Sequence, residues 1–156
     1  MLMRHTLLAT LLAFSTGMAA APMPYNETAN AGTEVEQALT QATATQKPVL
    51  LIFGANWCED CRALDAAMKN TKNASLVASK FVVVKIDVGN FDKNLPLTRQ
   101  YGNPTSGGIP AAVIVSPDNQ VLYTTRAGEL ANARRMSKTG VYDFFRNAAS
   151  LTQIKK

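Results

Sequence analysis

The sequence predicts a single α/β domain in which a central mixed β-sheet is flanked by helices on both faces. Two strongly apolar runs are typical of buried central strands, because a strand covered on both faces lacks polar alternation: 49–53, which is continuous, and 81–87, which is apolar apart from Lys85 and Asp87. Helical spacing between them predicts a crossover between parallel strands. A hairpin signal at 111–125 and a closing helix complete the pattern.

The amino-terminal half is expected to contain three helices and two strands. A helix over 33–45, capped by its first residue, Thr33, ends before Lys47-Pro48. The strand 49–53 follows, and a second helix begins at Glu59. A short helical piece over 73–80 then precedes the strand 81–87.

The carboxyl-terminal half is expected to hold a helix, a hairpin and a final helix. The helix covers 95–101 and is closed by a glycine. Strands 111–115 and 120–125 are joined by the turn 116–119, Ser-Pro-Asp-Asn. The last helix covers 139–150, and its apolar face consists of Val141, Phe144, Phe145 and Ala148.

The chain divides into a signal peptide at 1–20, a flexible lead-in at 21–32 and a folded domain at 33–156. The first segment carries Arg4, an apolar core at 7–14 and a small-residue cleavage region. This core is too short for a normal transmembrane span of about 20 residues. We therefore expect a soluble periplasmic domain released by cleavage, with an uncleaved anchor as the alternative.

The only two cysteines, Cys58 and Cys61, lie three positions apart at the junction of a strand and a helix. Free N–H groups of the first helical turn point toward Cys58, and their partial positive charge favours thiolate over thiol. The thiolate is the reactive form. This spacing and setting predict a disulfide that closes and reopens as a redox centre.

A static disulfide and half of a metal site are the alternatives for the cysteine pair. Zinc requires about four ligands, and the single histidine, His5, falls in the predicted signal peptide. We therefore expect no metal, and no cofactor other than the Cys58–Cys61 disulfide itself. A static disulfide closing so short a loop would constrain the unfolded chain little.

The net charge of +5 comes from scattered basic residues. The only basic doublets are Arg134-Arg135 and Lys155-Lys156, which we interpret as solvated surface charges. Without a basic stripe interleaved with aromatics, no nucleic-acid partner is expected. Nothing in the sequence requires more than a monomer.

Two motifs carry a resemblance to the thioredoxin fold family: Trp57-Cys58-Glu59-Asp60-Cys61 after a strand, and Gly108-Ile109-Pro110 before a hairpin. The resemblance covers about residues 33–150. It implies that Cys58 attacks, that Cys61 resolves and that a cis Pro110 faces the pair. It also implies that the backbone of Ile109 binds a substrate strand.

The segment 54–65 is also similar to the exported C-terminal domain of the membrane thiol reductase DsbD and to its single-domain periplasmic relatives. That similarity implies electron transfer to exported proteins, with a DsbD-type membrane reductase as the donor. The chain departs from many thioredoxins at Ile52, where they carry a buried acid, and at Glu59-Asp60, where they carry Gly-Pro.

Two further residues near the motif have more than one interpretation. Asp65 lies on the helix face of Cys61, and burial there would raise its pKa and suit it to relay a proton. An ordinary surface acid is the alternative. Trp57 is expected to shield the disulfide and bind substrate, unless it only packs.

These observations predict a reductase of disulfides in exported proteins. Glu59 and Asp60 place two negative charges beside Cys58, which oppose the thiolate and lower the reduction potential. The alternatives are a disulfide oxidase or isomerase, and a non-catalytic binding module that uses the segment 107–109.

Overall fold

The computed structural model describes residues 23–153, so the predicted signal peptide lies outside the described residues. The elements, in chain order, are α1 (Ala31–Thr45), β1 (Val49–Gly54), α2 (Glu59–Met68), α3 (Thr71–Lys80), β2 (Val82–Asp87), α4 (Leu95–Gln100), η1 (Pro104–Gly107), β3 (Ala111–Val115), β4 (Val121–Thr124), η2 (Ala133–Arg135) and α5 (Lys138–Gln153).

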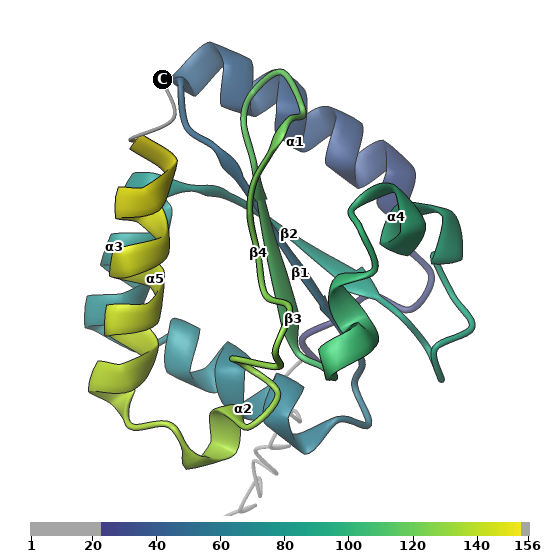
Figure 1. Cartoon of the computed structure of the whole chain (residues 1–156), viewed down its shortest axis with the longest axis vertical. Helices are drawn as coiled ribbons and strands as arrows, with labels where there is room; N and C mark the ends of the chain where they lie inside the picture. Colours follow the sequence, from purple (N-terminus) through teal and green to yellow (C-terminus); the bar gives the residue numbers. More distant parts are fainter. Residues whose placement is uncertain (1–22, 154–156) are drawn as a thin grey trace, which may run out of the picture.

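The four strands form one mixed sheet in the order β2-β1-β3-β4. β1 pairs with β2 in parallel, whereas the β1–β3 and β3–β4 pairs are antiparallel. Helices α2, α3 and α5 lie on one side of the sheet and α1 and α4 on the other (Figure 1). The predicted fold class, a mixed sheet with helices on both faces, is confirmed.

The core is centred on β1 and β3, whose residues are all buried. The expectation that the run 81–87 is a second central strand is wrong, because β2 is an edge strand among the described strands. Val83 on β2 is 36% exposed and Lys85 is half-buried. The other residues of β2 are mostly apolar because α1 and α3 pack against this strand.

Two helix starts differ from the sequence prediction because asparagine side chains cap them. α1 begins at Ala31, since Asn30 Oδ1 accepts a 3.1 Å hydrogen bond from the Thr33 N–H. Thr33 is therefore not the cap. α3 begins at Thr71 after the cap Asn70, because the side chain of Asn70 accepts a hydrogen bond from the backbone two residues later.

The strand register brings three chain segments to one end of the sheet. Gly54, the last residue of β1, is paired with Asp87, the last residue of β2. The antiparallel β3 starts at the same end, where Ala111 is paired with Phe53. The loop that follows β1 therefore lies beside the loop that follows β2 and the segment that precedes β3.

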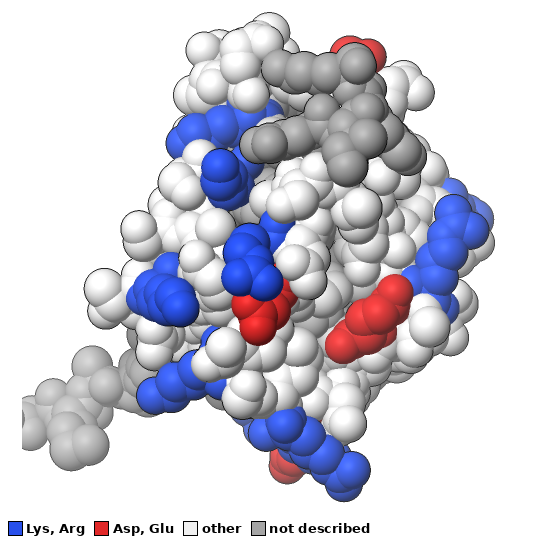
Figure 2. Space-filling model, turned by 60° about the vertical axis from the view of Figure 1, so that its left-hand side comes forward, with Lys and Arg blue, Asp and Glu red and all other residues white. Residues whose placement is uncertain are grey.

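Charged side chains are scattered on the face shown in Figure 2, where Lys and Arg are separated by uncharged surface and interspersed with acids. The positive net charge of the chain, +5, is therefore not gathered into a single basic patch on this face.

Candidate active site

Cys58 and Cys61 form a disulfide at the start of α2, with their Cα atoms 5.2 Å apart. Cys58 is the N-cap of the helix, and its Sγ accepts a 3.1 Å hydrogen bond from the Cys61 N–H. This donor and the helix dipole both stabilise negative charge on Cys58 once the disulfide opens. Cys58 is 6% exposed and Cys61 1%, so Cys58 is the more accessible sulfur.

Ile109 and Pro110 lie directly against the cysteine pair. The Ile109 carbonyl oxygen is 3.6 Å from Cys58 Sγ, and the Ile109–Pro110 peptide bond is cis. In the loop before them, the backbone at Gly107 packs closely against the backbone at Gly128. A Cβ added at Gly107 would stand only 2.7 Å from the Gly128 nitrogen, so this approach requires glycine. The structure thus brings Cys58, Cys61 and the Ile109–Pro110 segment together.

Trp57 is 53% exposed and flanks the disulfide on the side of the β2 loop. Its indole Nε1 donates a 2.9 Å hydrogen bond to the Gly89 carbonyl oxygen. Its ring meets the edge of Phe91 at a centroid distance of 6.1 Å, and Phe91 is itself 49% exposed. The role of Phe91 beside Trp57 is not evident from the sequence, because no local pattern indicates that the loop after β2 reaches Trp57.

Glu59 and Asp60 are paired with Arg134, a contact that is not evident from the sequence. The Arg134 guanidinium forms an ion pair with Glu59 and lies 3.7 Å from Asp60 Oδ2. Arg134 is an exposed surface residue, as expected, but its charge is paired with these two acids. One cation is held against the two acids beside Cys58, which reduces but does not abolish their opposition to the thiolate.

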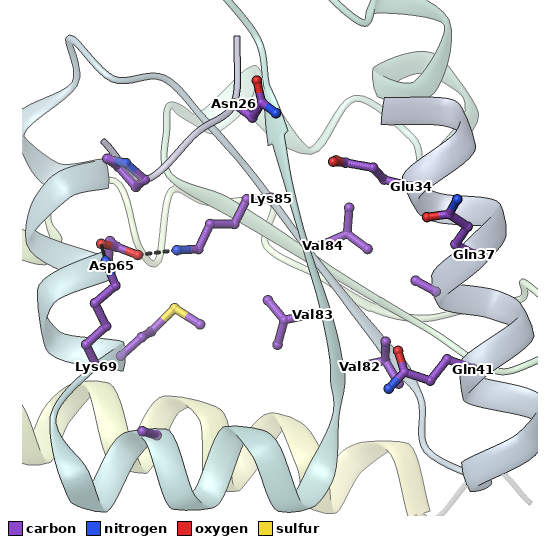
Figure 3. A pocket seen from close by; sticks show the side chains of 14 residues that line it. Asn26, Glu34, Gln37, Gln41, Asp65, Lys69, Val82, Val83, Val84 and Lys85 are labelled. Carbon is purple, nitrogen blue, oxygen red and sulfur yellow. Dashed lines mark hydrogen bonds and ion pairs between the residues drawn. The ribbon is translucent and has the colours of Figure 1, made fainter. Parts of the chain in front are cut away.

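Asp65 is buried and lies between two lysines. It forms ion pairs with Lys85 and, at 2.7 Å, with Lys69 (Figure 3). Burial acts to raise the pKa of Asp65, but the hydrogen bonds and charges of both lysines outweigh it, so the pKa lies below its usual value. The expected rise in pKa is wrong, and an acid held ionised in this way is poorly suited to relay protons.

Asp65 and Lys85 also line a groove of about 660 Å³ between α1, α2 and β2, the edge strand of the described sheet. Val83 and Gln41 line the same groove. Neither cysteine is among its lining residues, so the redox centre and this groove are separate features.

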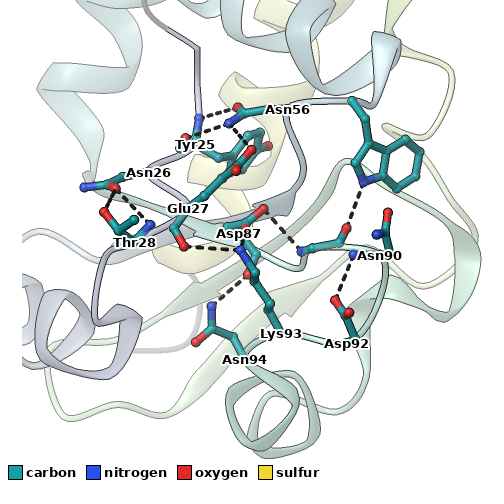
Figure 4. Close-up of polar contacts among 12 residues, drawn as sticks. Tyr25, Asn26, Glu27, Thr28, Asn56, Asp87, Asn90, Asp92, Lys93 and Asn94 are labelled. Carbon is teal, nitrogen blue, oxygen red and sulfur yellow. Dashed lines mark hydrogen bonds and ion pairs between the residues drawn. The ribbon is translucent and has the colours of Figure 1, made fainter.

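Residues 23–30, the described part of the segment before α1, have no helix or strand, but they are fastened to the active-site loop. Asn56 Oδ1 accepts a 2.9 Å hydrogen bond from the Tyr25 N–H, and Asn56 Nδ2 donates to the Tyr25 carbonyl oxygen at 2.9 Å (Figure 4). Asn56 Nδ2 also donates to Glu27. The ring of Tyr25 is buried, which anchors a segment that was expected to be a flexible lead-in.

Residues 30–117 match the family model described as thioredoxin-like. The chain belongs to the thioredoxin-like family. The matched region contains the cysteine pair, the Ile109–Pro110 bond and the first three strands of the sheet. A thioredoxin-like chain with a Cys-x-x-Cys disulfide has the fold and the reactive group of a thiol-disulfide oxidoreductase.

Solved structures agree with this family. A disulphide isomerase from Xylella fastidiosa Temecula1 is 58% identical, with a TM-score of 0.81, over 82% of this chain and 98% of that chain. The reduced C-terminal domain of Neisseria meningitidis DsbD is 19% identical, with a TM-score of 0.55, over 75% of this chain and 96% of that chain. At this identity the second similarity concerns the fold alone.

Among curated proteins, thioredoxin-1 of Drosophila yakuba is 38% identical over 58 residues. The alignment covers 37% of this chain and 50% of that thioredoxin. The chain thus spans half the length of this curated relative.

Proposed function

We propose that this protein is an exported thiol-disulfide reductase that reduces disulfides in other exported proteins through the Cys58–Cys61 dithiol. The observation that carries the proposal is the geometry of the two sulfurs. Cys58 Sγ accepts a hydrogen bond from the Cys61 N–H at the start of the helix and is the more accessible sulfur. Cys61 is almost fully buried. This asymmetry suits Cys58 to attack a protein disulfide and Cys61 to act only afterwards.

The reaction proceeds in two exchange steps. The Cys58 thiolate attacks one sulfur of the substrate disulfide, forming a mixed disulfide and releasing the other substrate sulfur as a thiolate. The Cys61 thiolate then attacks Cys58 Sγ, closes the Cys58–Cys61 disulfide and releases the second substrate sulfur. Two electrons pass to the substrate, and its two thiolates take protons from water. An exported dithiol donor reverses these steps to restore the protein.

Ile109, Pro110 and Trp57 are the residues we propose to contact the substrate. The carbonyl oxygen of Ile109 adjoins the attacking sulfur, so an extended peptide lying along this segment would bring its disulfide to Cys58. The exposed ring of Trp57 offers apolar surface on the opposite side of the pair.

The reductive direction rests on charge. The helix start favours the Cys58 thiolate, which alone would make the pair oxidising. Glu59 and Asp60 oppose that thiolate, and Arg134 supplies one cation against the two acids. The balance remains acidic, so the reduced form is less favoured than in an oxidase and the potential is lower.

The proposal of export to the periplasm rests on the pattern of residues 1–20, which are outside the described residues. Within residues 23–153, none of the helices combines the length and apolar character needed to cross a membrane.

A membrane thiol reductase of the DsbD type is the electron donor that we propose, and the protein acts as a monomer.

Disulfide isomerisation is the second candidate, because the 58% identical structure from Xylella fastidiosa is described as a disulphide isomerase. An isomerase also attacks with a reduced Cys58, but the substrate's own thiol, rather than Cys61, displaces it. The two activities therefore differ in their need for Cys61.

Insulin reduction with a dithiol donor tests the proposal. The wild-type protein should accelerate reduction, and Cys58→Ser should abolish the acceleration. Cys61→Ser should block turnover by trapping the mixed disulfide. If Cys61→Ser instead keeps full activity in reactivating a scrambled disulfide protein, isomerisation is favoured. A wild type that is inactive in both assays would indicate a binding module with a static disulfide.

A further inference from the structure

Tyr25 is a buried, polar residue next to the redox centre that the proposed exchange steps do not use. Tyr25 is 4% exposed, although it belongs to the segment before α1. A Cβ added at Gly54 would stand 2.2 Å from the Tyr25 hydroxyl oxygen and 2.9 Å from Cys61 Sγ. Both atoms therefore border the same small space beside Gly54, on the side of the enclosed cysteine.

Two features hold the Tyr25 hydroxyl in this position. Gly54 has no side chain, and any Cβ there would collide with the tyrosine. The Asn56 side chain forms two hydrogen bonds with the Tyr25 backbone, one with its N–H and one with its carbonyl oxygen, each 2.9 Å long. The tyrosine is thus placed by contacts with the strand end and the loop that lead directly into the cysteine motif.

We propose that the Tyr25 hydroxyl donates a hydrogen bond to the Cys61 sulfur when that sulfur becomes a thiolate, and thereby promotes the step in which Cys61 resolves the mixed disulfide. This inference rests on the proposed redox function of the pair. The segment before α1 would then contribute to catalysis, because it carries Tyr25 and places its hydroxyl beside Cys61.

The surroundings keep the tyrosine as a hydrogen-bond donor. Burial raises the pKa of Tyr25 well above its ordinary value, and the negative charges of Asp65 and Asp87 add to the rise. The charged groups near it include those two acids from α2 and β2, the lysines that pair with them, namely Lys69, Lys85 and Lys93, and Glu27, which accepts a hydrogen bond from the same Asn56 amide. The hydroxyl therefore stays protonated throughout the working pH range.

The exchange step balances without proton loss from the tyrosine. The Cys61 thiolate attacks Cys58 Sγ, the new sulfur–sulfur bond forms, and the bond from Cys58 to the substrate breaks. The electron pair leaves on the substrate sulfur, which takes a proton from water. In the reverse direction, a donor thiolate attacks Cys58 and Cys61 departs as a thiolate, again facing the Tyr25 hydroxyl.

Tyr25→Phe removes the hydroxyl and keeps the ring, so it separates the hydrogen bond from packing. In a Cys58→Ser background, the pKa of Cys61 is measured from its thiolate absorbance against pH. We expect Tyr25→Phe to raise this pKa by about one unit, because a hydrogen bond to a charged group favours the charged form. With both cysteines present, release of substrate from the mixed disulfide should slow about three- to tenfold.

Tyr101→Phe is the matched control, since Tyr101 is 2% exposed and its hydroxyl donates to Asn119 Oδ1 at 3.0 Å, away from the cysteines. It should leave the Cys61 pKa and the release rate unchanged. Tyr25→Phe should also leave the Cys58 pKa unchanged in a Cys61→Ser background, because the Cys61 N–H, not Tyr25, is the donor to Cys58.

An unaltered Cys61 pKa in Tyr25→Phe would overturn the inference, and so would an equal shift at Cys58, which would indicate a general packing change. These outcomes are distinguishable from failure of the proposed function. A wild type that does not reduce insulin refutes the reductase proposal, whereas the thiolate titration requires no turnover and reports on the Tyr25 contact alone.

Discussion

The Arg134 backbone N–H donates a 2.9 Å hydrogen bond to Asp60 Oδ1, although the two residues are 74 positions apart in the chain. The Arg134 side chain also pairs with Glu59, so the turn before α5 is fastened to the first turn of α2. Both acids adjoin Cys58, and a cation fixed on them therefore acts on the charge of the attacking sulfur.

Arg134→Gln should lower the reduction potential of the Cys58–Cys61 pair by about 10 to 30 mV. Without the cation, Glu59 and Asp60 oppose the Cys58 thiolate more strongly, and the reduced form loses stability relative to the disulfide. Equilibration with a glutathione redox buffer measures the change. Because the groups are partly exposed, the effect should shrink in high salt.

Arg135→Gln is the control for this prediction, since it removes the same charge from an exposed neighbour that makes no ion pair among the described residues. Replacing Glu59 by Gln and Asp60 by Asn together should shift the potential upward. Equal shifts in the Arg134 and Arg135 variants would indicate a net-charge effect rather than the specific pairing.

The contrast between the cysteines and Arg134 shows what the sequence can predict. Cys58 and Cys61 are three positions apart at a strand-to-helix junction, so local geometry alone placed them correctly at the helix start. Arg134 reaches Glu59 only in the complete fold, because η2 packs on α2 although the two elements are far apart in the sequence. No local pattern distinguishes this arginine from its neighbour Arg135.

Asn56→Ala should lower the free energy of unfolding by about 1–3 kcal/mol, because it removes the hydrogen bonds that hold the Tyr25 backbone. It should also make the segment 23–30 more susceptible to proteolysis. Chemical denaturation and limited proteolysis measure these changes. Asn90→Ala, at an exposed loop position, is the control and should alter neither property. If Asn56→Ala resists protease as well as the wild type does, these hydrogen bonds do not hold the segment in place.

Asp65→Asn should destabilise the protein at neutral pH by about 1–2 kcal/mol, since it leaves Lys85 and Lys69 without their acid. The folded-state pKa of Asp65 is lowered, so its contribution is present above the unfolded value of about 3.9 and is lost as pH falls further. The stabilities of the two proteins should converge in acid.

Denaturant unfolding at several pH values tests this behaviour, with Asp143→Asn as the control. Asp143 pairs with Arg146 on the exposed surface of α5, so its replacement should change stability little at any pH. A difference between Asp65→Asn and wild type that grows as the pH falls would contradict the lowered pKa.

Asp65 and Tyr25 show why part of the site escaped prediction. The sequence placed Asp65 on the face of Cys61 and left open whether it is buried or an ordinary surface acid. The structure shows it buried, and its partner lysine on β2 depends on how the sheet packs against α2. Tyr25 lies in a segment without periodicity, and its anchoring depends on the absence of a side chain at Gly54. Contacts between residues far apart in the chain cannot be predicted from the spacing or composition of the sequence.

The reduction potential of the wild-type Cys58–Cys61 pair tests the proposed function most directly. The remaining acidic balance around Cys58 predicts a value below about −200 mV, toward the ~−270 mV of thioredoxin. Equilibration with a glutathione buffer, followed by alkylation and mass analysis of the reduced fraction, gives this value. A potential near the ~−120 mV of the oxidant DsbA would contradict the reductase proposal.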